Sequence, residues 1–294
     1  MIAANGSFGY TAEGTIAIGK AHRARRLALV LPREHGAWGL LLIPMVTGAG
    51  IALRESHHFV PGLLLLASAL ALFWLRTPVE SLIGTSAMRA HTRDERRLVI
   101  QLIIALAAAA GLCLGTLLWA GRNPLLWLIG AVAVCAFVAQ ALVRKIGRPA
   151  RMLSEIIGTV GLTLSAPAIY YVITGKFTST AVMLWLANLL VAGDQIHYVQ
   201  LRIRTARIED FKSRFVRGWT FAAGQFAMAG ALVAAAVMGY FPGVVLLAFI
   251  PILFRGFSFF FQKPGTLVVR RLGWNELTEG IAFCVLFVGL FALA

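Results

Sequence analysis

The chain has 294 residues, of which 59% are hydrophobic and 13% are charged, and its formal net charge is +15. Its mean hydropathy is +0.81, and a soluble domain of this length would need far more polar surface. The basic residues stand in short segments between long apolar runs, so they indicate membrane topology and not a nucleic-acid partner. The three cysteines lie inside apolar runs, without the spacing of a disulfide framework or a zinc site. Composition therefore predicts an all-α, polytopic membrane helix bundle.

The first 33 residues differ from the rest of the chain. They carry a basic cluster from Lys20 to Arg33 and a preceding stretch rich in Gly, Ala and Thr. We expect residues 1–33 to form a cytoplasmic tail that is partly disordered. Residues 34–294 are expected to form a single transmembrane helical domain.

About nine apolar runs are long enough to cross the bilayer core, which needs roughly 20 residues per helix. The eighth run is the weakest, because Pro251 interrupts it and Arg255 follows closely. The predicted spans are Gly36–Leu53, Phe59–Leu75, Leu98–Trp119, Pro124–Val143, Ser154–Ile173, Thr180–Val199, Gly218–Tyr240, Gly243–Phe260 and Leu277–Ala294.

The distribution of lysine and arginine predicts the orientation of these spans. Five basic residues precede the first span, and five, four, six and four follow the second, fourth, sixth and eighth. Of the 27 in the chain, 24 therefore fall on one side, and only Arg54, Arg122 and Lys176 fall on the other. The positive-inside rule then predicts a cytoplasmic N-terminus and an external C-terminus.

The densest polar constellation lies at the end of the sixth predicted span. Asp194 and His197 are i,i+3 neighbours, and so are His197 and Gln200, so one helical stripe presents a carboxylate, an imidazole and an amide. Such a stripe could carry out acid–base chemistry, or could bind a diphosphate-bearing substrate through a metal ion. We interpret Asp194 and His197 as candidate catalytic residues; the alternative is that they pair with neighbouring helices and only hold the bundle together. The candidate substrate-binding residues around them are Asn188, Gln195, Tyr198, Gln200 and Arg202.

Three further groups of polar residues have both functional and structural interpretations. Glu34 and His35, at the start of the first span, are candidate catalytic residues, although Glu34 also suits the positive end of a helix dipole. Arg76 and Glu80, around Pro78, are candidates for substrate and metal binding, and as an i,i+4 pair they could simply bond to each other. Tyr170 is a candidate substrate-binding residue; an aromatic belt at the outer membrane interface is the favoured alternative.

Two family resemblances follow from these residues. The stretches Pro32-Arg-Glu-His-Gly-Ala-Trp-Gly, Ser165-Ala-Pro-Ala-Ile-Tyr-Tyr and Asp194-Gln-Ile-His-Tyr-Val-Gln resemble the YwiC-like family of bacterial membrane proteins. More distantly, nine helices with the N-terminus inside are similar to the UbiA superfamily of intramembrane prenyltransferases. Within it, Ile196-His197-Tyr198 followed by Glu209-Asp210-Phe211 resembles the haem O synthase branch. That resemblance implies a UbiA-like fold in which His197, Asp194 and Asp210 line the cytoplasmic mouth of a cavity.

The chain departs from the superfamily where its first Asp-rich motif should stand. The end of the second span reads Arg76-Thr-Pro-Val-Glu80 and offers one carboxylate. Mg²⁺ normally needs several oxygen ligands, and Glu80 and Asp194 are the candidates for holding it between carboxylates and diphosphate. Arginines such as Arg76 and Arg202 could neutralise a diphosphate directly instead.

Three functions remain open on the sequence. The first is transfer of an isoprenyl group from its diphosphate to a lipophilic acceptor, such as a quinone precursor or a porphyrin. The second is a non-catalytic membrane protein that binds a lipid, quinone or haem and has lost the metal site. The third and least favoured is a small-solute transporter, because the outer half of the bundle lacks the charges that an alternating-access pathway would use. The expected partners are a lipophilic small molecule or prenyl diphosphate, together with membrane lipids.

Overall fold

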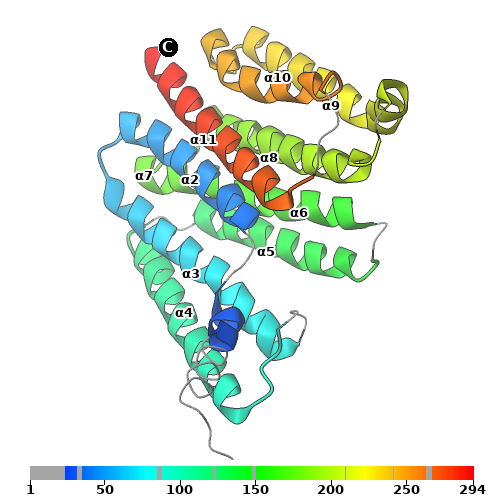
Figure 1. The fold of residues 1–294 in the computed structure, drawn as a ribbon. Coiled ribbons are helices and arrows are strands. Elements are labelled where there is room, and N and C mark those ends of the chain that lie inside the picture. The colour runs from blue at the N-terminus through cyan, green and yellow to red at the C-terminus, as the bar shows by residue number, and fades with distance from the viewer. Residues whose placement is uncertain are drawn as a thin grey trace, which may run out of the picture. The chain divides into compact units, whose positions relative to one another are not determined.

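The computed structural model describes most of the chain, in eight stretches. They are residues 24–31, 35–84, 88–121, 124–147, 150–208, 210–240, 242–262 and 267–294. Figure 1 shows that the described elements are helices, which confirms the predicted all-α class. Glu34 and most of the predicted tail lie outside the described residues.

Each predicted span coincides with a helix or with two consecutive helices. The elements are α2 (His35–Glu55), α3 (Phe59–Ile83), α4 (Arg93–Trp119), α5 (Pro124–Arg144), α6 (Arg151–Thr163), α7 (Ser165–Thr174), α8 (Ser179–Thr205), α9 (Phe211–Val237), the 3₁₀ helix η2 (Gly243–Phe249), α10 (Ile250–Ser258) and α11 (Val269–Leu293).

Seven helical segments among the described residues are long and apolar enough to cross a membrane. They correspond to α3, α4, α5, the pair α6 and α7, α8, α9 and α11. The predicted eighth span is shorter, because Gly243–Ser258 consists of η2 and α10. The chain is thus a polytopic helical membrane protein.

Proline residues have different effects in three of these segments. Pro167 lacks an N–H group, and the helix is interrupted three residues earlier, at Leu164, between α6 and α7. Pro251 stands in the first turn of α10, where the missing N–H has no partner to lose. Pro78, a residue type that usually kinks or ends a helix, lies inside α3, and that helix continues to Ile83.

The contacts divide the chain into two compact units. The first contains residues 1–33 and 67–113, and the second contains residues 34–66 and 114–294. Helices α3 and α4 each contribute residues to both units. The prediction of one transmembrane domain over residues 34–294 stays a prediction.

In the first unit, a short helical segment at residues 24–30 is bonded to the start of α4 and to α3. Arg25 donates to Glu95 at 2.6 Å, and Glu95 also accepts from the backbone N–H of His91. The carbonyl oxygens of Leu29 and Val30 accept from side chains of α3, namely the Ser81 hydroxyl and the Trp74 indole. These bonds satisfy carbonyls that the end of a short helix leaves without intrahelical partners.

In the second unit, α2 packs against α7 and α11, and α8 packs against α6, α7 and α9. The approach of α2 to α7 is closest at Gly48, where an added Cβ atom would meet the backbone of Ala166. Only a glycine permits that approach, as is common between membrane helices. These contacts form the frame that positions the polar residues of α8.

Candidate functional site

The most highly connected polar site in the second unit is an ion cluster centred on Arg255. The guanidinium donates from Nη2 to Asp194 Oδ2 at 2.7 Å and from Nη1 to Glu276 Oε2 at 2.5 Å. The side chains of Arg255, Asp194 and Glu276 are only 11%, 4% and 11% exposed. Because the three residues come from α10, α8 and α11, one arginine joins three helices.

Neutral side chains complete the surroundings of this cluster. Gln225 of α9 donates its amide N–H to Asp194 Oδ1, and its amide group lies against Gly256 of α10. The Arg255 guanidinium also lies 4.2 Å from the centroid of the Tyr198 ring, within the range of a cation–π contact. One residue along α8 from Asp194, Gln195 donates to the backbone carbonyl of Glu276 at 2.9 Å.

The residue that α8 contributes to the cluster, Asp194, lies far from the C-terminal end of that helix. Asp194 stands 11 residues before Thr205, where the helix ends, which corresponds to about 16 Å along the axis. Charged groups at such depth are rare in membrane helices, face the bundle interior and pair with one another. The arrangement around Arg255 has all three properties.

Several buried polar atoms of the cluster have no hydrogen-bond partner among the described residues. They are Gln225 Oε1, Arg255 Nε, Glu276 Oε1 and Glu279 Oε2. Glu279 stands one helical turn after Glu276 in α11 and adds a third carboxylate. Three of these four atoms are hydrogen-bond acceptors, so the site contains more acceptors than donors.

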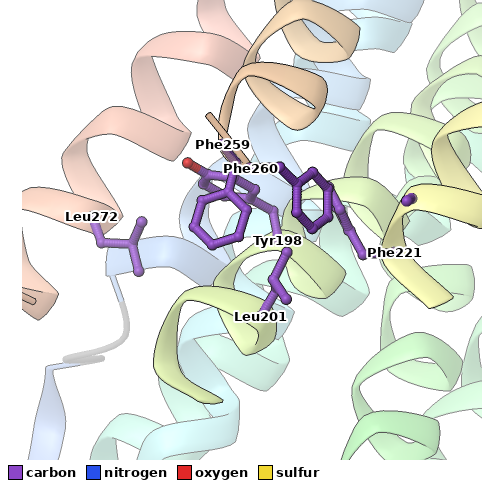
Figure 2. Close-up of a cluster of buried hydrophobic side chains, with 7 residues drawn as sticks. Tyr198, Leu201, Phe221, Phe259, Phe260 and Leu272 are labelled. Atoms are coloured by element: carbon purple, nitrogen blue, oxygen red, sulfur yellow. The ribbon is translucent and has the colours of Figure 1, made fainter. Parts of the chain in front are cut away.

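An aromatic cluster packs beside the ion cluster. Figure 2 shows the rings of Tyr198, Phe221, Phe259 and Phe260 gathered together, and their centroids are 5.3 to 6.4 Å apart in the contacting pairs. Leu201, Ala222 and Leu272 complete this buried group. Tyr198 belongs to both clusters, so its ring separates Arg255 from the apolar packing.

The other members of the predicted stripe face different helices. The His197 ring makes an edge contact with Phe221 of α9 at 5.2 Å between centroids, and it forms no hydrogen bond with the residues that the structure describes. Gln200 donates to Glu155 of α6 at 2.9 Å. Asn188 is buried and donates to the carbonyl of Leu184 in its own helix. The stripe therefore does not converge on a single point.

Three predicted substrate-binding residues have structural contacts elsewhere. Arg202 lies over the Phe259 ring at 5.6 Å. Asp210 caps α9 by accepting from the backbone N–H of Ser213 at 2.8 Å, and this bond lowers the pKa of the Asp210 carboxyl. The Tyr170 hydroxyl donates to the carboxylate of Glu55 at 2.8 to 2.9 Å and lies 3.1 Å from the Thr178 hydroxyl.

The remaining candidates belong to other parts of the chain. Arg76 and Glu80 form an ion pair of 2.8 Å along α3 in the first unit, as the structural interpretation of that pair expected. His35 is the first residue of α2, but its side chain lies outside the described residues, as does Glu34. The roles assigned to these residues stay predictions.

The structure describes no group of three or more His, Cys, Asp or Glu side chains with the arrangement of a metal site. Of the two carboxylates predicted to bind Mg²⁺, Asp194 is bonded to Arg255 and Glu80 to Arg76. An arginine on a carboxylate competes with a metal ion for the same oxygen atoms. The donor set that the structure describes therefore fits Mg²⁺ poorly.

Sequence reasoning missed two main members of the ion cluster and misjudged a third. Arg255 was counted with the basic residues that follow the eighth span, whereas the structure places it inside α10. Glu276 is not among the candidate residues that the sequence predicts. Gln225 had a signal that could have found it, because it is an amide in the middle of the apolar run that forms α9.

Fold and site together define a polytopic α-helical membrane protein with a buried ion cluster among its last four α-helices. The chain matches the family described as "YwiC-like protein" over residues 31–170. This confirms the predicted YwiC-like resemblance, and that stretch, from α2 into α7, is YwiC-like. No curated protein matches the chain. The resemblance to the UbiA superfamily stays a prediction.

Proposed function

We propose that this protein binds a lipophilic small molecule inside the membrane without a metal ion held between Glu80 and Asp194. The observation that supports this proposal most strongly is the bonding of Asp194. One carboxylate oxygen accepts from Arg255, and the other accepts from Gln225. A carboxylate with both oxygens occupied and with 4% exposure is a structural anchor of the bundle and a poor ligand for a diphosphate-bound Mg²⁺.

His197 is the residue through which we expect the molecule to be recognised. Its ring packs edge-on against Phe221, and it stands one turn after Asp194 on α8. The neighbouring position on α9 is Gly224, where an added Cβ atom would lie 3.9 Å from His197 Nδ1, so no large side chain covers the imidazole there. An apolar surface with a few polar groups is typical of sites for lipophilic ligands.

Prenyl transfer is the second candidate. It is favoured by the same imidazole, which forms no hydrogen bond with the described residues and could serve as a base or orient an acceptor. In that case arginines such as Arg202 would neutralise the diphosphate in place of a carboxylate-bound metal ion. The two candidates differ in their dependence on Mg²⁺ and in whether a labelled prenyl group leaves its diphosphate.

The experiment is mass spectrometry of the full-length protein purified from membranes, before and after treatment with EDTA. We expect a lipophilic molecule that co-purifies with the protein, survives EDTA and is lost in the His197→Ala variant. His57→Ala is the matched control, because His57 lies in the loop between α2 and α3. Absence of any bound molecule, or loss of the molecule in both variants, would contradict the proposal.

The same preparation separates the second candidate from the first. Radiolabelled farnesyl diphosphate is incubated with the protein and a lipophilic extract, with and without Mg²⁺. The binding proposal predicts no transfer under either condition. Transfer that disappears in the His197→Ala variant would overturn it in favour of the transferase.

We further propose that the ion cluster lies toward the cytoplasmic side of a bacterial plasma membrane. The distribution of basic residues supports this orientation. Cysteines introduced singly at Ser56, after the first predicted span, and at Arg207, after the sixth, should react with a membrane-impermeant thiol reagent in opposite preparations of membranes. Labelling of Ser56→Cys from the cytoplasmic side would contradict the orientation.

A further inference from the structure

The ion cluster contains more negative than positive groups. Asp194, Glu276 and Glu279 supply three carboxylates, and Arg255 is the cation with which Asp194 and Glu276 form ion pairs in the part of the chain that the structure describes. Glu279 is close enough to interact electrostatically with both of these carboxylates. With all four residues ionised, the cluster would carry two excess negative charges.

Such an excess is unfavourable at this position. Removing an ion from water and burying it is costly even after the surroundings relax. Carboxylates that share a site respond to mutual repulsion by keeping a proton on one of them. The position of the cluster within α8, α10 and α11 makes solvent screening weak.

A second observation comes from Gln225, which contributes no charge. Its side chain is 1% exposed, and its amide N–H points at Asp194. Its amide oxygen has no hydrogen-bond partner among the described residues, and neither do Glu276 Oε1 and Glu279 Oε2. Among the described atoms of the site without a partner, these three acceptors therefore outnumber the donor, Arg255 Nε, and a proton on a carboxyl group supplies both a further donor and a positive charge.

Other titratable groups lie on the elements packed around the cluster. On α8 these are His197, Tyr198, Arg202 and Arg204; on α9 they are Lys212, Arg214 and Arg217; on α11 they are Arg270, Arg271 and Cys284. Arg202 and Arg214 both lie over the Phe259 ring, and Arg214 donates to the carbonyl of Gln262. Helix η2 has no titratable residue, and α2 contributes His35, whose side chain lies outside the described residues, and Arg54 and Glu55 at its other end.

We propose that the cluster of Asp194, Arg255, Glu276 and Glu279 is a proton-binding site within the membrane. One carboxylate of the cluster takes up a proton from the aqueous phase and becomes a carboxylic acid, which lowers the excess charge by one. A proton requires only one carboxylate, whereas a metal ion requires a group of ligands that the described residues do not form. This proposal is independent of the bound lipophilic molecule and of His197.

Infrared difference spectroscopy of the full-length protein in lipid nanodiscs tests the proposal. The carbonyl stretch of a protonated carboxyl group is recorded as the pH is raised from acidic to alkaline values in a sodium-free buffer. We expect a protonated carboxyl band that persists at neutral pH in the unmodified protein. It should be lost or shifted in Glu276→Gln or in Glu279→Gln, which mimic the protonated acid.

Glu155→Gln is the matched control. Glu155 lies on α6 and is bonded to Arg151 and Gln200, outside the cluster, so its substitution should leave the band unchanged. Glu279 forms no ion pair with the described residues, so Glu279→Gln keeps the test usable even if Glu276→Gln fails to fold. A protein without the band at neutral pH, or a band that survives in Glu276→Gln, in Glu279→Gln and in Asp194→Asn, would overturn the proposal. So would a band that disappears when sodium is added, because a sodium ion would then balance the charge.

Discussion

Two arginine–carboxylate contacts in this chain differ in their sequence separation and in how exposed they are to solvent. Arg76 and Glu80 are four residues apart on α3, and their side chains are 20% and 34% exposed. Arg255 binds carboxylates from two other helices, with 11% exposure. The Arg76–Glu80 contact joins two turns of one helix, whereas the contacts of Arg255 join α8, α10 and α11 to one another.

The largest expected effect is that of removing the shared cation. Arg255→Gln leaves the carboxylates of Asp194 and Glu276 buried without a counter-ion. Breaking a buried ion pair by removing one partner typically destabilises a protein by about 3–5 kcal/mol. Unfolding of the purified protein in detergent should show a loss of this order, and a loss below about 1 kcal/mol would remove the distinction between the two contacts.

The contact of Tyr170 with Glu55 tests a carboxylate that accepts from a hydroxyl group and not from an arginine. Tyr170→Phe removes the hydroxyl that bonds to Glu55 and lies beside Thr178. Hydrogen bonds to charged groups contribute about 1.5–3 kcal/mol, so we expect a loss of stability in this range. Ligand retention should be unchanged in the same variant if Tyr170 is structural; loss of the co-purified molecule from a folded Tyr170→Phe protein would instead support its predicted role in substrate binding.

The Arg76–Glu80 pair should contribute much less to the free energy of unfolding. Glu80→Gln removes one ion pair between neighbouring turns, and such pairs contribute about 0.3–0.5 kcal/mol. The unfolding midpoint should therefore move very little, and Mg²⁺ should not change it. A stabilisation by Mg²⁺ in the unmodified protein that Glu80→Gln abolishes would restore the predicted metal role of Glu80.

The smallest effect is expected at Asp210, and it depends on pH. The bond from Ser213 lowers the pKa of Asp210 in the folded protein, so its contribution to stability is present above the ordinary aspartate pKa and is lost as the pH falls through the lowered value. Asp210→Asn keeps an acceptor for the cap but does not titrate. The unfolding midpoints of the unmodified protein and of Asp210→Asn are measured at neutral and at acidic pH. The difference between the two midpoints should be smaller at acidic pH.

Much of the fold could be predicted from the sequence, because apolar runs of membrane length have few structural alternatives. The helices α4 and α5 follow their predicted runs closely, and the interruption near Pro167 follows from its missing N–H. The end of α3 could not be predicted in the same way, since Pro78 is accommodated inside that helix.

The candidate site was less predictable. Asp194 was found because it is a carboxylate in an apolar run, and the contacts of Gln195 and Tyr198 place them at the same cluster. Its counter-ion lies 61 residues further along the chain. No local pattern connects these two residues, and the packing of α8, α10 and α11 brings them together. Arg255 was instead grouped with the basic residues that indicate orientation, because the sequence does not show where α10 ends.

The most direct test of the central role of Arg255 is a double-mutant cycle between Asp194 and Arg255. The stabilities of the unmodified protein, Asp194→Asn, Arg255→Gln and the double variant are measured under one set of conditions in detergent. An ion pair at the centre of the bundle predicts a coupling free energy at the upper end of the usual range, about 2–3 kcal/mol. A coupling free energy near zero would show that Arg255 does not stabilise the carboxylate of Asp194. Asp194 would then again be a candidate metal ligand.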